Sequence, residues 1–289
     1  MALGMTVASF DLRKTPAVIA QLERSGQRTT LTLDGCPTVW RAWGSGPALV
    51  LLHGGHGSWM HWVRNIAHLA QHFRVLVPDM PGFGDSGDWA VPARDPARAG
   101  LLIECLRQGI AELAPGEPVR LAGFSFGGAI ACALAAQLPS LARLALIGSG
   151  GHGGPRREKQ ALLDWRQFSG EAQLQAWRQN LRAFMLHENR AVDDLALYIH
   201  AHACLKTRFR SKELSRSPMA LEALANVHVP VALLWGEEDV TAVPREAALA
   251  FQQGLPERAV TLVPGAGHWL QYEQAAVVND GLGRWFMPS

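Results

Sequence analysis

The sequence predicts an α/β protein with a doubly wound, mostly parallel sheet. Two observations lead to this prediction: short unbroken apolar runs recur along the chain, and stretches with apolar residues at helical spacing lie between them. Unbroken apolar runs are typical of strands buried on both faces, as in a parallel sheet. A repeated strand–helix–strand order is typical of a sheet with helices on both sides.

Six apolar runs are expected to form the buried strands, and a hairpin is expected before them. The hairpin falls within residues 29–43, where weak alternation is broken by Asp34-Gly35, a strong turn signal. The six runs are Ala48–Leu52, Arg74–Pro78, Val119–Ala122, Leu141–Ile147, Val229–Trp235 and Ala259–Val263.

Helices are expected at Ala97–Leu113, at Gly128–Leu138, which ends before Pro139, and at Pro244–Phe251. The last of these begins with a proline at the first helical position, where its missing N–H costs nothing.

The periodicity changes between residues 150 and 226, where helix-like stretches rich in aromatic residues carry almost no strand signal. At 289 residues the chain is near the upper limit of a single hydrophobic core. We therefore expect one α/β core, residues 1–149 and 227–289, with residues 150–226 inserted as a helical cap.

Composition indicates an ordinary globular enzyme. The formal net charge is +2 and basic residues form only short clusters, which argues against a nucleic-acid partner. The four cysteines are widely spaced and form no C-x-x-C pair, so neither a disulfide framework nor a zinc site is expected. The N-terminus does not resemble a secretory signal, and no apolar run reaches membrane-spanning length. The expectation is a cytoplasmic monomer or homodimer that acts on a small molecule, with no membrane partner.

Gly123-Phe124-Ser125-Phe126-Gly127 lies between a predicted strand and a predicted helix. G-x-S-x-G in this context predicts a sharp turn that presents a nucleophilic serine, with small neighbours that avoid clashes. The turn also places Ser125 at a helix N-terminus, where free N–H groups favour negative charge.

A serine hydroxyl needs a base to take its proton, and the base needs a group that orients it. His268 follows the last predicted strand in a glycine-rich loop and is the expected base. Asp239 follows the preceding strand and is the expected acid, with Glu237 and Glu238 as competitors. The order serine, acid, histidine is the one expected for a triad on this kind of sheet.

A glycine-rich loop, residues 53–58, follows the first buried strand. Its glycines allow backbone N–H groups to approach a tetrahedral intermediate. We expect the oxyanion donors to be Gly55, with His56 as the alternative, and Phe126, each worth roughly 3–4 kcal/mol.

Taken together, these motifs resemble the α/β-hydrolase family from about Leu31 onward, and Pro78–Ser86 looks like the loop that follows the next core strand in that family. The helical insertion matches the cap that roofs the substrate pocket in the family. Because the nucleophile is serine, the resemblance excludes the haloalkane dehalogenase and epoxide hydrolase branches, which carry aspartate there. It leaves hydrolysis of esters, thioesters or lactones, carbon–carbon bond hydrolysis and cofactor-free haloperoxidation.

Two other patterns are interpreted as decoys. Gly82–Gly87 satisfies G-x-G-x-x-G, but no helix pattern opens directly after it, so a dinucleotide site is not expected. Histidines at 53, 56 and 61, and at 200 and 202, lack a carboxylate or thiolate at metal-ligand spacing. We expect no metal and no cofactor.

Residues 267–273 resemble the segment around the catalytic histidine of carbon–carbon hydrolases of aromatic degradation. Those enzymes usually carry asparagine where this chain has Phe124, and a cap arginine where it has Ala201. Three substitutes for that arginine remain open: Arg190, Arg208 and Arg210. The sequence therefore favours carboxylic ester hydrolysis first, carbon–carbon hydrolysis second and a non-catalytic binding relative last.

The substrate pocket is expected to be apolar and aromatic, and to suit a small hydrophobic or aromatic acyl group. Its expected lining is Phe124 beside the nucleophile, Trp269 after the base, Trp59 after the glycine-rich loop, and His56.

Overall fold

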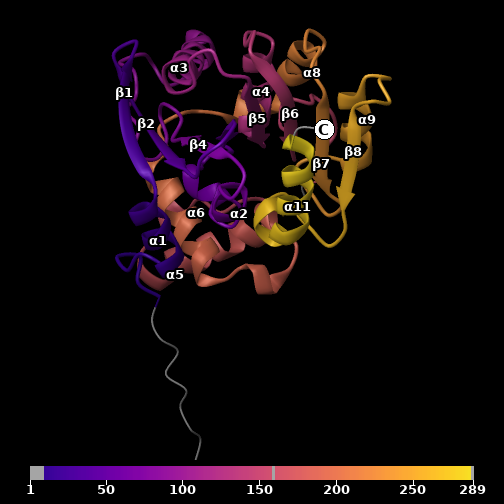
Figure 1. Ribbon diagram of the computed structural model, residues 1–289. Coiled ribbons are helices and arrows are strands. Elements are labelled where there is room, and N and C mark those ends of the chain that lie inside the picture. Colours follow the sequence, from indigo (N-terminus) through magenta and orange to yellow (C-terminus); the bar gives the residue numbers. More distant parts are fainter. Residues whose placement is uncertain (1–9, 158–159, 288–289) are drawn as a thin grey trace, which may run out of the picture.

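The computed structural model describes residues 10–157 and 160–287. One eight-stranded sheet runs in the order β1-β2-β4-β3-β5-β6-β7-β8, and only the β1–β2 and β2–β4 pairs are antiparallel (Figure 1). This is the predicted doubly wound, mostly parallel sheet. The expectation that the N-terminus is not of the secretory type concerns residues 1–18, of which residues 1–9 lie outside the described residues.

The strands are β1 (Gln27–Leu33), β2 (Cys36–Trp43), β3 (Ala48–Leu52), β4 (Arg74–Pro78), β5 (Val119–Phe124), β6 (Leu141–Ile147), β7 (Val231–Gly236) and β8 (Ala259–Val263). The α-helices are α1 (Ala17–Ser25), α2 (Ile66–Leu69), α3 (Ala97–Leu113), α4 (Phe126–Ala135), α5 (Gly170–Asn180), α6 (Asp194–Lys206), α7 (Lys212–Arg216), α8 (Met219–Leu224), α9 (Pro244–Gln252), α10 (Leu270–Glu273) and α11 (Ala275–Phe286). Short 3₁₀ segments are η1 (Trp59–Trp62), η2 (Trp165–Gln167) and η4 (Asn189–Ala191), and η3 (Leu181–Met185) is π-helical.

Strands β3, β4, β6 and β8 and helix α3 have the predicted bounds. β5 continues to Phe124 and α4 starts at Phe126, so a single residue, Ser125, separates strand from helix. The predicted hairpin joins β1 to β2, and its turn residues Asp34 and Gly35 have φ of 48° and 72°. Positive φ at both turn residues matches the twist of the flanking strands.

The two faces of the sheet bury two separate cores, because side chains alternate along each strand. On β3, Leu49 and Leu51 face the side covered by α2 and α11, and Val50 and Leu52 face the side covered by α3, α4 and α9. Figure 1 shows α3, α4 and α8 on one side of the sheet and α2 and α11 on the other.

Within residues 150–226, the described part contains helices and no strand. Helices α5 and α6 lie together at one end of the sheet (Figure 1), and residues of this segment and of the core line one cavity between them. The last helix, α8, packs against the core helix α4 and contributes Ala220 and Leu224 to the core. The boundaries of the cap stay a prediction.

The segment before β1 packs against the rest of the chain. Helix α1 buries Ile19 and Leu22, and the Trp43 indole N–H donates to the Leu22 carbonyl at 2.8 Å. None of the helices within the described residues combines the length and the apolar character needed to cross a membrane.

Candidate active site

Ser125 occupies a strained turn between β5 and α4, with φ 54° and ψ −117°. Positive φ is rare for a residue with a Cβ and costs on the order of 1–3 kcal/mol. The flanking glycines are required by close backbone contacts: a Cβ at Gly123 would overlap the Gly127 carbonyl, and one at Gly127 would overlap the His53 carbonyl. The turn therefore holds the hydroxyl above the carboxyl end of the sheet.

Three predicted side chains form one hydrogen-bonded row. His268 Nε2 lies 2.8 Å from Ser125 Oγ, and His268 Nδ1 lies 2.8 Å from Asp239 Oδ2. Because the carboxylate only accepts, Nδ1 carries the proton and Nε2 is left to accept from the serine hydroxyl. The competing acids Glu237 and Glu238 are exposed, whereas Asp239 is fully buried.

Thr241 was missed by the sequence analysis. Its backbone N–H and its hydroxyl both donate to Asp239 Oδ1, at 2.7 and 2.8 Å. Burial of Asp239 by itself raises the pKa of the carboxyl, but the electrostatic attraction of His268 and the hydrogen bonds from His268 and Thr241 outweigh burial and lower it. The sequence signal that could have revealed Thr241 is its place two residues after Asp239, because an aspartate side chain often accepts a hydrogen bond from the backbone amide two residues further on.

Of the two predicted oxyanion donors, Gly55 lines the same cavity as Ser125, and Phe126 directly follows Ser125 in the chain. Phe126 is the first residue of α4, and a Cβ on Gly55 would lie 3.7 Å from the Phe126 Cβ. Among the described residues, neither amide donates to a main-chain carbonyl. His56, the alternative donor, has φ 48° and opens onto the cavity.

Two buried histidines hold the loop that carries Gly55. His53 Nε2 accepts from the Met80 amide at 3.0 Å, so its Nδ1 carries the proton that is donated to the Gly54 carbonyl. His61 Nδ1 accepts from the Gly54 amide at 3.2 Å. These backbone contacts engage both ring nitrogens of His53 and the Nδ1 of His61.

Burial makes several histidines harder to protonate in the folded protein. It lowers the pKa of His53, lowers that of His61 well below the usual 6.5, and lowers that of His200 to about 4. Each is neutral when folded near neutral pH, whereas the unfolded chain protonates these groups near pH 6.5.

Stability is therefore expected to fall as the pH drops from 7.5 to 5.5. A histidine whose pKa is lower in the folded than in the unfolded chain adds most to the free energy of unfolding above its unfolded pKa. Each such histidine can change the free energy of unfolding by up to about 1.4 kcal/mol per pH unit. Urea unfolding across this range measures the slope. His200→Gln, which cannot titrate, is expected to reduce it, and stability independent of pH would contradict the expectation.

A cavity of about 540 Å³ opens beside Ser125 and His268. Phe124 and His56 line it, as expected. Trp59 and Trp269 do not, so their assignment to the pocket is wrong.

Both tryptophans are buried in the core instead. The Trp59 ring packs 5.5 Å from that of Trp43. Trp269 stacks 4.2 Å from Tyr272 and donates its indole N–H to the His61 carbonyl at 3.0 Å.

The cavity is also more polar than predicted. Besides Phe184, Met185 and Leu163, its lining includes His200 and several basic residues: Arg156, Arg166, Lys212 and Arg216. The three arginines proposed as substitutes for a cap arginine, Arg190, Arg208 and Arg210, are not part of the lining, and Ala201 is buried on α6 next to His200.

The fold and this row of side chains define an α/β protein that carries a serine on a strand–helix turn, with a histidine and an aspartate behind it. A family model described as "Alpha/beta hydrolase family" matches residues 49–280. The chain belongs to the alpha/beta hydrolase family and is a hydrolase.

Several relatives are similar over most of the chain. 2-Hydroxy-6-oxo-6-phenylhexa-2,4-dienoate hydrolase of Burkholderia cepacia is 28% identical, over 82% of this chain and 86% of its own length. Pimeloyl-[acyl-carrier protein] methyl ester esterase of Nitrosospira multiformis is 29% identical, over 82% and 94%. A solved meta-cleavage product hydrolase from Pseudomonas fluorescens IP01 has the same fold, with a TM-score of 0.73 at 22% identity over 89% of this chain and 97% of its own.

Proposed function

We propose that this hydrolase cleaves a carbon–carbon bond next to a ketone in a ring-cleavage product, with Ser125 as nucleophile, His268 as base and Asp239 as the acid that orients it. The observation that carries the proposal is the hydrogen-bonded row of these three side chains at the cavity. The names of the relatives shift the preference from ester hydrolysis, which the sequence favoured, to carbon–carbon hydrolysis.

In the proposed reaction, His268 Nε2 takes the proton of Ser125 as Oγ attacks the ketone carbon. The N–H groups of Gly55 and Phe126 stabilise the resulting oxyanion. When the intermediate collapses, the electron pair of the carbon–carbon bond goes to the leaving carbon, which takes the proton from His268. A water deprotonated by His268 then attacks the acyl-enzyme and releases the acid and free Ser125.

A leaving carbon is a poor leaving group unless its electron pair is delocalised. The 2-keto tautomer of such a substrate, formed when the enol proton moves to the carbon at the scissile bond, supplies that delocalisation, because its carbonyl takes up the electron pair through the conjugated double bond. The carboxylate gives the substrate its negative charge. Four basic residues in the cavity lining, Arg156, Arg166, Lys212 and Arg216, are suited to such an acid.

Ester hydrolysis is the second candidate, and one observation favours it. On the cap helix α6 the cavity is lined by His200, whose pKa of about 4 leaves it uncharged at neutral pH. A neutral imidazole suits an uncharged acyl group better than a carboxylate, because a buried anion needs a cationic partner. The reaction would use the same nucleophile and base.

The deciding experiment compares two substrates on the purified protein, 2-hydroxy-6-oxo-6-phenylhexa-2,4-dienoate and p-nitrophenyl butyrate, each followed by absorbance. Higher kcat/KM on the dienoate supports carbon–carbon hydrolysis, and higher kcat/KM on the ester assigns the protein to ester hydrolysis. Turnover of neither substrate would contradict the proposal and favour a non-catalytic binding role. Ser125→Ala is the control for both.

A further inference from the structure

The loop after β4, residues 79–87, lies between the glycine-rich loop and the cap. We call it the junction loop. On one side it contacts residues 53–59, which carry the Gly55 amide, and on the other it contacts the end of α6 and the residues that follow. No helix opens directly after it, since α3 begins only at Ala97.

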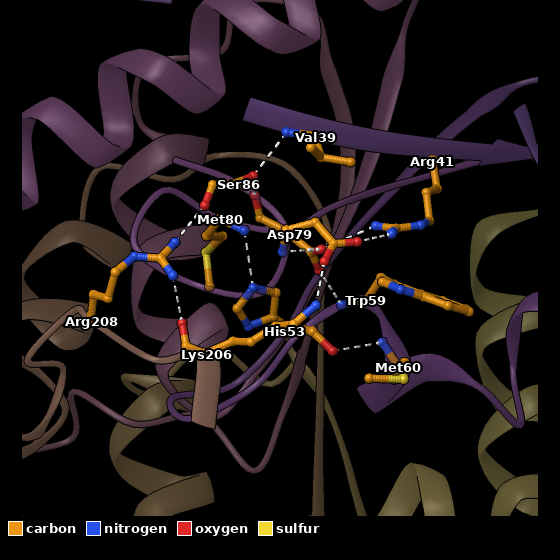
Figure 2. Close-up of polar contacts among 12 residues, drawn as sticks. Val39, Arg41, His53, Trp59, Met60, Asp79, Met80, Ser86, Lys206 and Arg208 are labelled. Atoms are coloured by element: carbon orange, nitrogen blue, oxygen red, sulfur yellow. Dashed lines mark hydrogen bonds and ion pairs between the residues drawn. The ribbon is translucent and has the colours of Figure 1, made fainter. Parts of the chain in front are cut away.

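Asp79 is the centre of the junction loop and is almost fully buried. Its Oδ1 accepts from the Trp59 amide at 2.8 Å, and its Oδ2 accepts from the Asp85 amide and from Arg41 Nη1, both at 3.0 Å. Figure 2 shows the contacts of Asp79 with Arg41 and with Trp59. The carboxylate therefore joins β2, the junction loop and Trp59, the first residue after the glycine-rich loop.

The residue after Asp79 holds the other end of the glycine-rich loop. The Met80 amide donates to His53 Nε2, as Figure 2 shows, and His53 in turn donates to the Gly54 carbonyl at 2.8 Å. Residues on both sides of Gly55 are thus fixed from the junction loop. Gly84, with φ 50°, leaves room for this, because a Cβ there would overlap the Asp79 carboxyl.

The cap contacts the same loop through charged groups. Lys206 Nζ, at the end of α6, lies 2.6 Å from Asp85 Oδ1, and Asp85 Oδ2 pairs with Arg41. Burial opposes ionisation of Asp85, but Lys206 and Arg41 outweigh it and lower the pKa of the carboxyl. The Arg208 guanidinium also donates to the Ser86 carbonyl.

From these contacts we propose that Asp79 is a positioning residue for the oxyanion-binding amide, and that the Lys206–Asp85 pair couples the cap to it. The inference rests on the proposed function, because it assigns Gly55 the oxyanion. Backbone donors contribute most when they are aimed at the oxyanion in advance, and small displacements of such groups lower the rate. In this role the Asp79 carboxylate fixes the orientation of the Gly55 amide and does not contact the substrate.

The first test compares Asp79→Asn with Asp88→Asn. Asp88 pairs with the buried Arg98, ten residues along the chain, and neither side chain has a hydrogen bond to the glycine-rich loop. Both variants are expected to lower the Tm, because each leaves an arginine without one carboxylate. Only Asp79→Asn is expected to lower kcat, by about 10- to 100-fold, a fraction of the loss of one oxyanion donor, while KM changes little.

Equal kcat values for the two variants, or a rise in KM that accounts for the loss, would overturn the inference. Failure of the proposed function is distinguishable, because it shows in the wild type itself, which would then prefer the ester or turn over neither substrate.

A second test changes residues at the exposed end of these contacts, so it can be interpreted even if the Asp79→Asn variant does not fold. Lys206→Met is expected to lower kcat about threefold, as a partly exposed pair is worth little, and to have no effect in an Asp85→Asn background. Arg178→Met, which breaks a pair with the exposed Glu171 elsewhere in the cap, is the control. An unchanged kcat in Lys206→Met, or additive effects of Lys206→Met and Asp85→Asn, would overturn the coupling.

Discussion

Replacing Ser125 by alanine is expected to abolish turnover of every substrate that the wild type hydrolyses. Without the hydroxyl no acyl-enzyme forms, and losses of a triad nucleophile are about 10⁴- to 10⁶-fold in kcat. The fold should survive, because alanine at φ 54° is no more strained than serine and no packing is lost. Initial rates with and without the substitution, together with circular dichroism, measure this.

Ser217→Ala is the matched control for that variant. Ser217 lies within the predicted cap, donates its hydroxyl to the Leu214 carbonyl at 2.9 Å and does not line the cavity. Normal turnover in Ser125→Ala would remove the serine from the mechanism altogether, whereas loss in both variants would point to a folding defect.

Replacing Asp239 by asparagine is expected to lower kcat by about 10³- to 10⁴-fold. The amide group can donate to His268 Nδ1, which then loses its proton and leaves Nε2 protonated and unable to accept from Ser125. Because Thr241 still holds the side chain through two hydrogen bonds, the fold should change little. Steady-state kinetics and the Tm are the measurements.

Glu237→Gln serves as the control, since that side chain is exposed two residues away. It is expected to behave as wild type. Near-normal kcat in Asp239→Asn together with a large loss in Glu237→Gln would transfer the acid role to Glu237.

The sheet was predictable because its signal is local. A run such as Ala48–Leu52 is apolar at every position, as a strand buried on both faces must be, and its ends are set by turns. The positions of Ser125, Asp239 and His268 followed from the same logic, since residues that come directly after parallel strands meet at one edge of the sheet.

The features that the sequence did not reveal depend on the direction in which a side chain points and on contacts between residues far apart in the chain. His268 and Trp269 are neighbours in the chain, yet one side chain reaches Ser125 and the other stacks on Tyr272 in the core. Proximity in sequence therefore predicted the pocket wrongly for Trp269 and Trp59. Asp79 carries no local signal for its role, because its partners Arg41 and Trp59 are separated from it by 38 and 20 residues.

The turn at Ser125 places two selective pressures in opposition. Its positive φ destabilises the folded chain, and glycine would adopt the same angles without a steric penalty. Selection for heat tolerance alone would therefore reward loss of the very group on which turnover is proposed to depend. Anyone evolving this protein in the laboratory should screen activity in every round, since the most robust descendants are expected to include inert ones.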